Sequence, residues 1–226
     1  FNQIEAAKAY LFANSEFPDS SWNTKIARDI FWEQSMHGIL QENAGVNLKD
    51  FQNEDEFFSY LSKSAIFTAK RGNQDYYFFP IPAIDYLSHE KIKAYNLSGE
   101  TVELTPKQED FENHRSYQYQ DLTTRGTVEF RSVCAQSFDK TFVSAAFHLG
   151  ILANLDNVQK YLQEADFFKE EGRDYKQLRQ KFSKKEISGS AKTHVRNFAN
   201  DLIQLAIAGL VVRNNGEDSY LKDLIV

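Results

Sequence analysis

Apolar residues recur at intervals of three and four along several stretches, which is the spacing of one face of an α-helix. The pattern predicts helices over residues 4–12, 53–63, 139–162 and 192–212. Asp139 is the expected N-cap of the third helix. Gly209 interrupts the last apolar stretch and indicates close packing or a weak point. Residues 164–185 are mostly polar and charged, so we expect a solvated helix and its connections there.

Aromatic and β-branched residues predict a hairpin in the first half of the chain. Residues 64–68 and 76–81 are rich in Ile, Phe and Tyr, and a Lys-Arg-Gly-Asn turn over residues 70–73 lies between them. Pro80 and Pro82 lack a backbone N–H, so the second strand is either an edge strand or ends at these residues.

Strand and helix stretches are segregated along the chain, and they do not alternate strictly. The spacing of Thr101, Glu103 and Thr105 also permits a short strand over residues 101–105. This order predicts an α+β fold with a mostly antiparallel sheet and helices packed on one side. Because 226 residues suffice for one sizeable core, we expect a single domain over residues 1–226.

Composition and charge exclude several classes of function. The net charge is −6 and the basic residues form no long run, which disfavours nucleic acid as a partner. No apolar run reaches the roughly 18 residues of a membrane span, so no membrane partner is expected. Cys134 is the only cysteine, which excludes an internal disulfide and a thiolate zinc site and suits a reducing, cytoplasmic location. Any anionic ligand must therefore be held by local guanidinium groups.

Residues 125–131, Arg-Gly-Thr-Val-Glu-Phe-Arg, carry the most informative charges. Alternation along a strand puts Arg125, Glu129 and Arg131 on one face. A plain half-buried strand has the same alternation. A carboxylate flanked by two guanidinium groups also suits a site that holds both a metal ion and an anion, because Mg²⁺ prefers oxygen ligands and guanidinium binds phosphate.

This stretch resembles the strand of glutamate–cysteine ligases of the plant and actinobacterial type, which are distant relatives of glutamine synthetase. The segment Asp-Phe-Glu-Asn-His over residues 110–114 and the ending over residues 216–224 are also similar to that family. The resemblance implies that Glu129 binds a catalytic metal ion and that Arg131 faces the transferred phosphoryl group, with Arg125 assisting from the same face.

The resemblance also implies a substrate pocket. Arg28 and Trp32 have the spacing of an Arg and a Trp of that pocket, and His114 matches a histidine near the substrate. From the residues alone, Arg28 and Trp32 could equally form a structural cation–π pair on one helical face. A single histidine such as His114 is more often structural.

The function implied by the resemblance is ATP-dependent joining of the glutamate γ-carboxylate to cysteine through γ-glutamyl phosphate, the first step of glutathione synthesis. Its small-molecule partners are glutamate, cysteine and ATP, and its cofactor is Mg²⁺. The fold would be the C-terminal part of a glutamine synthetase-like catalytic fold.

The start of the chain suggests an upstream part. The chain opens at Phe1 inside a stretch that is interpreted as helical, and Met36 is the only methionine. In the family the other metal-binding carboxylates lie on earlier strands, so we expect these 226 residues to need the N-terminal part of the same protein and to be inactive alone.

Two alternatives stay open. One is a related carboxylate–amine ligase with another acceptor. The other is a non-catalytic domain that retains the fold, because Cys134 lies in the segment where the family usually has an aspartate. Cys134 itself could be a nucleophile, but an inert thiol fits better because no histidine is close in sequence.

Overall fold

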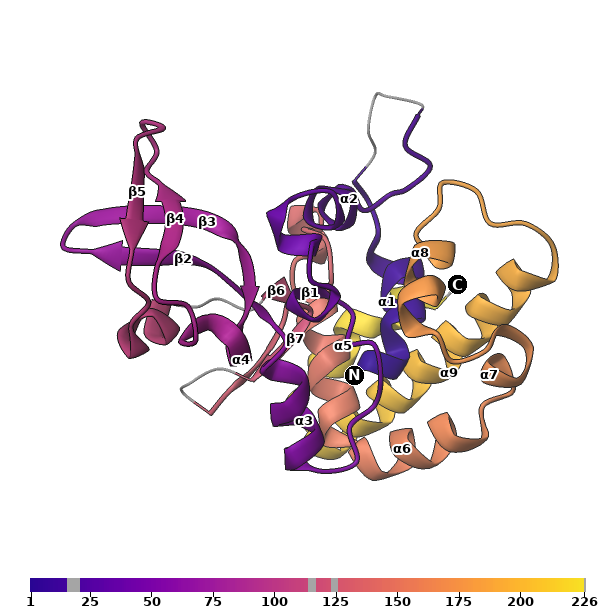
Figure 1. The fold of residues 1–226 in the computed structure, drawn as a ribbon. Helices are drawn as coiled ribbons and strands as arrows, with labels where there is room; N and C mark the ends of the chain where they lie inside the picture. Colours follow the sequence, from indigo (N-terminus) through magenta and orange to yellow (C-terminus); the bar gives the residue numbers. More distant parts are fainter. Residues whose placement is uncertain (16–20, 114–116, 123–125, 226) are drawn as a thin grey trace. The chain divides into compact units, whose positions relative to one another are not determined.

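The computed structural model describes residues 1–15, 21–113, 117–122 and 126–225 (Figure 1). It is a mixed α+β structure with an antiparallel sheet of four strands, as predicted. The chain divides into two compact units. We call residues Phe1–Ala27 with Ser132–Val226 the helical unit and residues Arg28–Arg131 the sheet unit, and each is described by itself. The single domain expected from the sequence stays a prediction.

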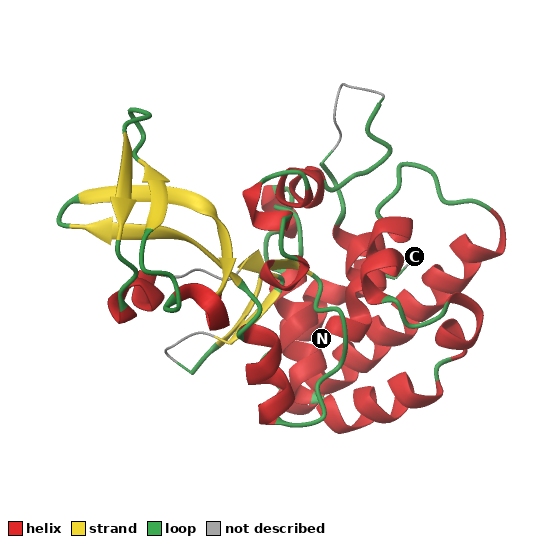
Figure 2. Cartoon of the chain, in the orientation of Figure 1, coloured by secondary structure: helices red, strands yellow, loops and turns green. Residues whose placement is uncertain are grey.

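Helices make up the helical unit (red in Figure 2). The long helix α9 packs against α5, α1 and α7, and α1 also packs against α8. The predicted helices over residues 4–12 and 192–212 are confirmed. The elements are η1 (Asn2–Ile4), α1 (Glu5–Phe12), η5 (Phe138–Lys140), α5 (Val143–Ala153), α6 (Leu155–Glu164), α7 (Asp166–Glu171), α8 (Tyr175–Phe182), α9 (Gly189–Arg213) and η6 (Glu217–Leu224).

The predicted helix over residues 139–162 is wrong in two respects. Asp139 lies in the short helix η5, and α5 begins only at Val143. The helix then breaks at Asn154, whose φ of −122° and ψ of 31° are not helical. The Asn154 side chain donates a 2.9 Å hydrogen bond to the Leu205 carbonyl of α9. The polar side chain thus serves a contact between helices, which the periodicity of a single segment cannot reveal.

The stretch over residues 164–185 is less solvated than its composition suggested. It forms α7 and α8, and the rings of Phe167 and Phe168 are buried there. The Phe167 ring stacks on Phe198 of α9 with a centroid distance of 4.2 Å. Each of these helices is too short to display a long apolar stripe, which explains why the sequence pattern underestimated their burial.

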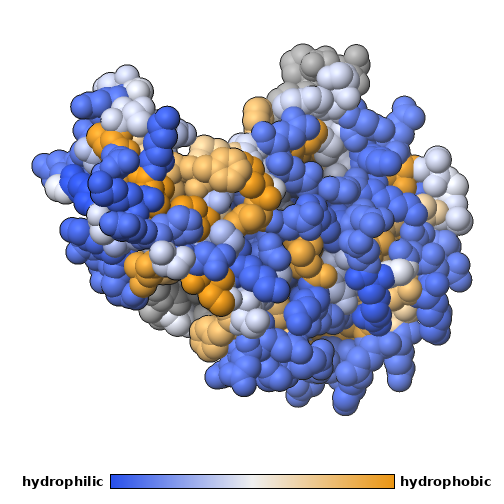
Figure 3. Space-filling model, in the orientation of Figure 1, coloured by the Kyte–Doolittle hydropathy of each residue, from blue (hydrophilic) through white to orange (hydrophobic). Residues whose placement is uncertain are grey.

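The helix α9 supplies much of the core of the helical unit. Among the residues that the structure describes, it alone is long and apolar enough to cross a membrane by length and composition, a property that a core helix shares. In this structure Val195, Leu202 and Ile203 on α9 are fully buried against the neighbouring helices. Hydrophilic side chains cover most of the face of the helical unit that is visible in Figure 3.

Two glycines allow α5 and α9 to approach closely. A Cβ atom on Gly150 would lie 2.3 Å from the carbonyl oxygen of Ala206, and one on Gly209 would lie 2.3 Å from the carbonyl oxygen of Gly150. Both distances are far below a normal van der Waals contact. Of the two alternatives for Gly209, close packing or a weak point, the structure shows close packing, because the two helix backbones meet at this crossing.

We expect Gly150→Ala to lower the free energy of unfolding by about 1–3 kcal/mol, because the added methyl group forces the two helix backbones apart. The loss should appear although alanine favours a helix over glycine by about 1 kcal/mol. Urea denaturation of both proteins measures the difference. Gln204→Ala, at an exposed position of α9, is the control and should leave stability nearly unchanged. A Gly150→Ala protein as stable as the parent would contradict the close crossing.

The sheet unit contains the strands (yellow in Figure 2). The main sheet is antiparallel in the order β2-β3-β4-β5, β1 and β6 form a short parallel pair, and β7 and β8 form an antiparallel pair. The elements of the sheet unit are α2 (Ala27–Glu33, which begins at the unit boundary), η2 (Met36–Gly38), η3 (Gln41–Asn43), β1 (Ala44–Gly45), α3 (Glu54–Leu61), β2 (Ala65–Arg71), β3 (Gln74–Pro82), α4 (Ala83–Tyr86), β4 (Ile92–Tyr95), β5 (Thr101–Leu104), η4 (Gln108–Asn113), β6 (Tyr117–Gln118), β7 (Gln120–Leu122) and β8 (Val128–Phe130).

The predicted hairpin, the helix over residues 53–63 and the short strand near residue 101 are confirmed. The helix begins as expected, because the Asn53 side chain accepts a hydrogen bond from the Glu56 amide. β3 is a central strand, and the prolines lie at its end, where pairing with β4 has stopped. Tyr86 of α4 and Phe111 of η4 pack against the apolar cluster of the sheet, so short helices cover it.

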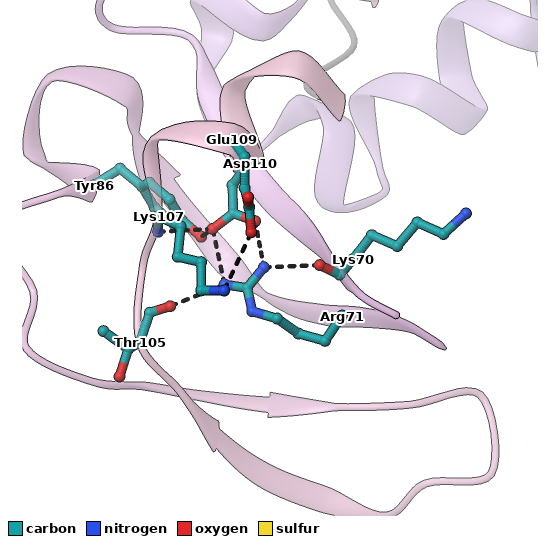
Figure 4. A network of polar contacts seen from close by, with 7 residues as sticks. All are labelled: Lys70, Arg71, Tyr86, Thr105, Lys107, Glu109 and Asp110. Atoms are coloured by element: carbon teal, nitrogen blue, oxygen red, sulfur yellow. Dashed lines mark hydrogen bonds and ion pairs between the residues drawn. The ribbon is translucent and has the colours of Figure 1, made fainter. Parts of the chain in front are cut away.

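A buried carboxylate fastens η4 to the main sheet (Figure 4). Asp110 is fully buried and accepts hydrogen bonds from both terminal nitrogens of Arg71, from the Tyr86 hydroxyl at 2.8 Å and from the Lys107 amide at 2.9 Å. Burial raises the pKa of the Asp110 carboxyl, but the hydrogen bonds from Arg71, Lys107 and Tyr86 outweigh it and lower the pKa overall. All of its partners belong to the sheet unit, so Asp110 has a structural role.

Candidate active site

The β7–β8 pair brings two carboxylates together on one face. Asp121 of β7 lies directly opposite Glu129 of β8 in the antiparallel register. Directly opposite residues of an antiparallel pair project to the same face and interact. Arg131, two residues after Glu129, lies on that face as well. Asp121 was not singled out from the sequence, because only the strand register shows that it faces Glu129.

The Arg131 guanidinium bridges the two carboxylates. Its Nη2 donates to Asp121 Oδ2 at 2.8 Å and to Glu129 Oε2 at 2.7 Å, and its Nε donates to the same Glu129 oxygen at 3.1 Å. The Arg131, Asp121 and Glu129 side chains remain 27%, 16% and 37% exposed, so a ligand can reach them. We call these three residues the acid–arginine cluster. With two carboxylates and one guanidinium, it carries a net negative charge.

Burial and charge act in opposite directions on Arg131. Burial disfavours its charged form, but the hydrogen bond to Glu129 and the negative charge of Asp121 outweigh burial and raise the pKa of the guanidinium. Arg131 is therefore a permanent cation in this cluster.

Tyr119 fixes the position of the acid–arginine cluster through its backbone. Its amide donates a 2.8 Å hydrogen bond to the Gly45 carbonyl of β1, and its carbonyl accepts one of 2.8 Å from the Arg131 amide. Gly45 has a φ of 82°, a conformation that favours glycine. The short β1–β6 and β7–β8 ladders are thus joined at a single residue.

The side chain of Tyr119 belongs to a second predicted group. The Arg28 guanidinium lies 5.3 Å from the Trp32 ring centroid and 5.4 Å from the Tyr119 ring centroid. The structural cation–π pair that the spacing of Arg28 and Trp32 allowed is therefore present. Tyr119 also donates a hydrogen bond to the Asp29 carboxylate, which orients its ring.

Arg28 retains unused hydrogen-bonding capacity. Its Nε and Nη2 atoms are buried and have no hydrogen-bond partner among the described residues. Burying a donor without an acceptor costs about 1–3 kcal/mol, and more for a charged group. A carboxylate ligand would satisfy both atoms, since the guanidinium fork matches two carboxylate oxygens.

Aromatic rings surround the Arg28 group. The Trp32 ring lies 5.5 Å from that of Tyr117, and the His37 ring lies 4.1 Å from the same Tyr117 ring. Burial lowers the pKa of His37, which favours its neutral form. His37 was one of the five scattered histidines of the sequence, and only the fold places it beside Trp32.

Two of the predicted site residues, Arg125 and His114, lie outside the described residues. Within residues 1–15, 21–113, 117–122 and 126–225, no group of three or more His, Cys, Asp or Glu side chains could hold a metal ion. The pair of Asp121 and Glu129 therefore does not form such a group with a third described side chain. Cys134 belongs to the helical unit, where it is partly buried and its Sγ accepts a hydrogen bond of 3.7 Å from the Ser15 hydroxyl.

Comparison of the chain with protein-family models and with curated proteins finds no match.

Proposed function

We propose that this chain is the C-terminal part of an ATP-dependent ligase that joins the γ-carboxylate of glutamate to cysteine, with a glutamine synthetase-like fold completed by upstream sequence. The observation that carries the proposal is the acid–arginine cluster, in which Asp121 and Glu129 face each other across two strands and share Arg131. Two carboxylates and a fixed guanidinium on one partly exposed face suit a nucleotide with its divalent cation.

The donor set fits Mg²⁺. This ion takes oxygen ligands and is commonly bound through one or two carboxylates together with substrate phosphates and water. Asp121 and Glu129 would be the protein ligands from this chain. When bound, Mg²⁺ neutralises phosphate charge during phosphoryl transfer. The proposed upstream part would supply further carboxylates.

Arg131 would act on the phosphoryl group. Asp121 and Glu129 would balance less of the Arg131 charge if they held a cation, and the guanidinium would then be available to phosphoryl oxygens. Glutamate is a poor acyl donor until its γ-carboxylate carries a phosphoryl group, and that transfer redistributes negative charge. A fixed cation stabilises this charge in the transition state without having to reorganise.

Arg28 would hold a carboxylate of the amino-acid substrate. Its guanidinium is oriented by Trp32 and Tyr119, and two of its buried nitrogens have no acceptor within the described part of the chain. The Tyr119 carbonyl also accepts a hydrogen bond from the Arg131 amide, so Tyr119 contacts both Arg28 and the acid–arginine cluster. This connection supports a shared site for amino acid and nucleotide.

We expect Arg28→Lys to raise the KM for glutamate about tenfold or more and to change kcat less. Lysine keeps the positive charge but cannot form a bidentate pair with a carboxylate. Steady-state kinetics of the full-length gene product measure both constants. Lys93→Arg, at an exposed position of β4, is the control and should leave KM unchanged. An unchanged KM in Arg28→Lys would leave Arg28 as a structural partner of Trp32.

The proposed function is tested by measuring phosphate release from ATP with Mg²⁺ and glutamate, with and without cysteine. Cysteine-dependent release by the full-length gene product supports the ligase, and we expect none from the 226-residue chain alone. Release that requires another amine would indicate a ligase with a different acceptor. No release with any amine would indicate a non-catalytic protein that retains the fold.

A further inference from the structure

The helical unit contains a cavity of about 560 Å³ that is lined by lysines. It is formed by the end of α1, the segment around Lys25, and the loop that joins α8 to α9 (light orange in Figure 1). All of its lining residues belong to the helical unit and none to the acid–arginine cluster. The volume is within the range of roughly 300–1,000 Å³ that is typical of small-molecule sites.

The charge of this cavity is opposite to that of the chain. Its lining includes Lys25, Lys184, Lys185 and Lys192 but only one carboxylate, Glu186, whereas the whole chain has a net charge of −6. Four cations around one cavity repel one another, and this repulsion is relieved when an anion binds between them.

Most of these lysines are not used in ion pairs. No described residue forms an ion pair with Lys25, Lys184 or Lys192. Other lysines of the helical unit do have carboxylate partners, such as Lys8 with Glu5 and Lys181 with Glu171. Lys25, Lys184 and Lys192 therefore have no carboxylate partner among the described residues.

The backbone holds the two sides of the cavity together. The Lys25 amide donates a 2.7 Å hydrogen bond to the Ser183 carbonyl at the end of α8, and the Lys25 carbonyl accepts one of 2.8 Å from the Ser15 amide. The hydroxyl groups of Thr24 and Ser183 lie 3.1 Å apart. Lys25 is thus anchored beside Lys184 and Lys185, and this part of the cavity exists before any ligand binds.

We propose that this lysine-lined cavity binds a small molecule that carries several phosphate groups. Lysine ammonium groups act as point charges from different directions, which suits phosphate oxygens. The cavity also has apolar walls from Phe182 and Ile187, which would contact the uncharged part of such a molecule. The cavity shares no lining residue with the proposed active site, so the two proposals can be tested independently.

The proposal is tested by titrating the chain with inorganic tripolyphosphate at low ionic strength in a calorimeter. We expect the Lys184→Gln/Lys192→Gln double variant to bind about tenfold more weakly or not at all, because charged hydrogen bonds are lost. The control is Lys140→Gln/Lys160→Gln, which removes the same charge at exposed positions outside this cavity and should bind within about twofold of the parent. Both double variants replace exposed side chains, and equal melting temperatures check that they fold.

Four results would overturn the proposal. The parent chain could fail to bind tripolyphosphate, or the two double variants could weaken binding equally, which would indicate a general charge effect. Binding could also be lost in Arg131→Gln while the lysine variant binds normally, which would place the anion in the acid–arginine cluster. Citrate binding as tightly as tripolyphosphate would exclude phosphate as the preferred group.

Discussion

Glu129→Gln is expected to lower the kcat of the full-length gene product by about 100-fold or more. Glutamine has the same size as glutamate but supplies no charged oxygen to a cation, and it weakens the pair that holds Arg131. Phosphate release with Mg²⁺, glutamate and cysteine measures the loss. We also expect the variant to need a higher Mg²⁺ concentration for its remaining turnover, because only Asp121 would contribute a carboxylate from this face.

Glu103→Gln is a matched control in the same unit. Glu103 lies on β5 and pairs with Lys91 at 2.9 Å, and both side chains are well exposed. The chemical change is the same, but the position is on the main sheet and away from the β7–β8 pair. Its turnover should equal that of the parent. Turnover that is indifferent to Glu129 but sensitive to Glu103 would mean that the wrong strand had been assigned to the metal ion.

The second large effect is expected at a buried ion network in the helical unit. Glu5 accepts hydrogen bonds from Lys8 Nζ at 2.6 Å and from Arg179 Nη1 at 2.7 Å, and Arg179 Nη2 donates to the Ser132 carbonyl at 2.9 Å. The side chains of Glu5, Lys8 and Arg179 are at most 2% exposed. Charges this deep in a protein depend on their partners, because water cannot solvate them.

We expect Arg179→Met to lower the free energy of unfolding by about 3–5 kcal/mol, because it fills the space but leaves the Glu5 carboxylate short of one partner. Urea denaturation monitored by circular dichroism measures the loss. The control is Asp166→Asn, which breaks the exposed pair of Asp166 with Lys169. That pair has the same spacing along a helix as Glu5 and Lys8, and its loss should leave stability unchanged within error. A small effect in Arg179→Met would mean that the network is not tightly coupled.

The network also predicts a dependence on pH. Burial raises the pKa of Glu5, but the positive charges of Lys8 and Arg179 outweigh it and lower the pKa from 4.5 to about 2. A carboxyl group whose pKa is lower in the folded state than in the unfolded state stabilises the protein. This stabilisation is complete when the pH is above the pKa of the unfolded state. That contribution is lost as the pH falls from about 4.5 towards 2. The stability difference between the parent and Glu5→Gln should therefore shrink over this range.

Several of the elements could be predicted from the sequence alone. The helices over residues 4–12, 53–63 and 192–212 and the hairpin around residues 70–73 were predicted, because each is long enough to show its own period or carries its own cap or turn. Gly209 was also singled out, as a position of either close packing or weakness, and the structure shows close packing. These features depend on neighbours in the chain, which a sequence displays directly.

Tertiary structure alone decided the break at Asn154, the burial of α7 and α8, and the membership of the acid–arginine cluster. Glu129 and Arg131 were singled out from their alternation on one strand, but Asp121 joins them only through the register of β7 with β8. Arg28 and Trp32 likewise contact Tyr119 only in the folded protein. Asp29, which lies between them in sequence and also contacts Tyr119, is 90 residues away from it along the chain. Local periodicity carries no information on such pairings, because their free energy comes from contacts between segments far apart in the chain.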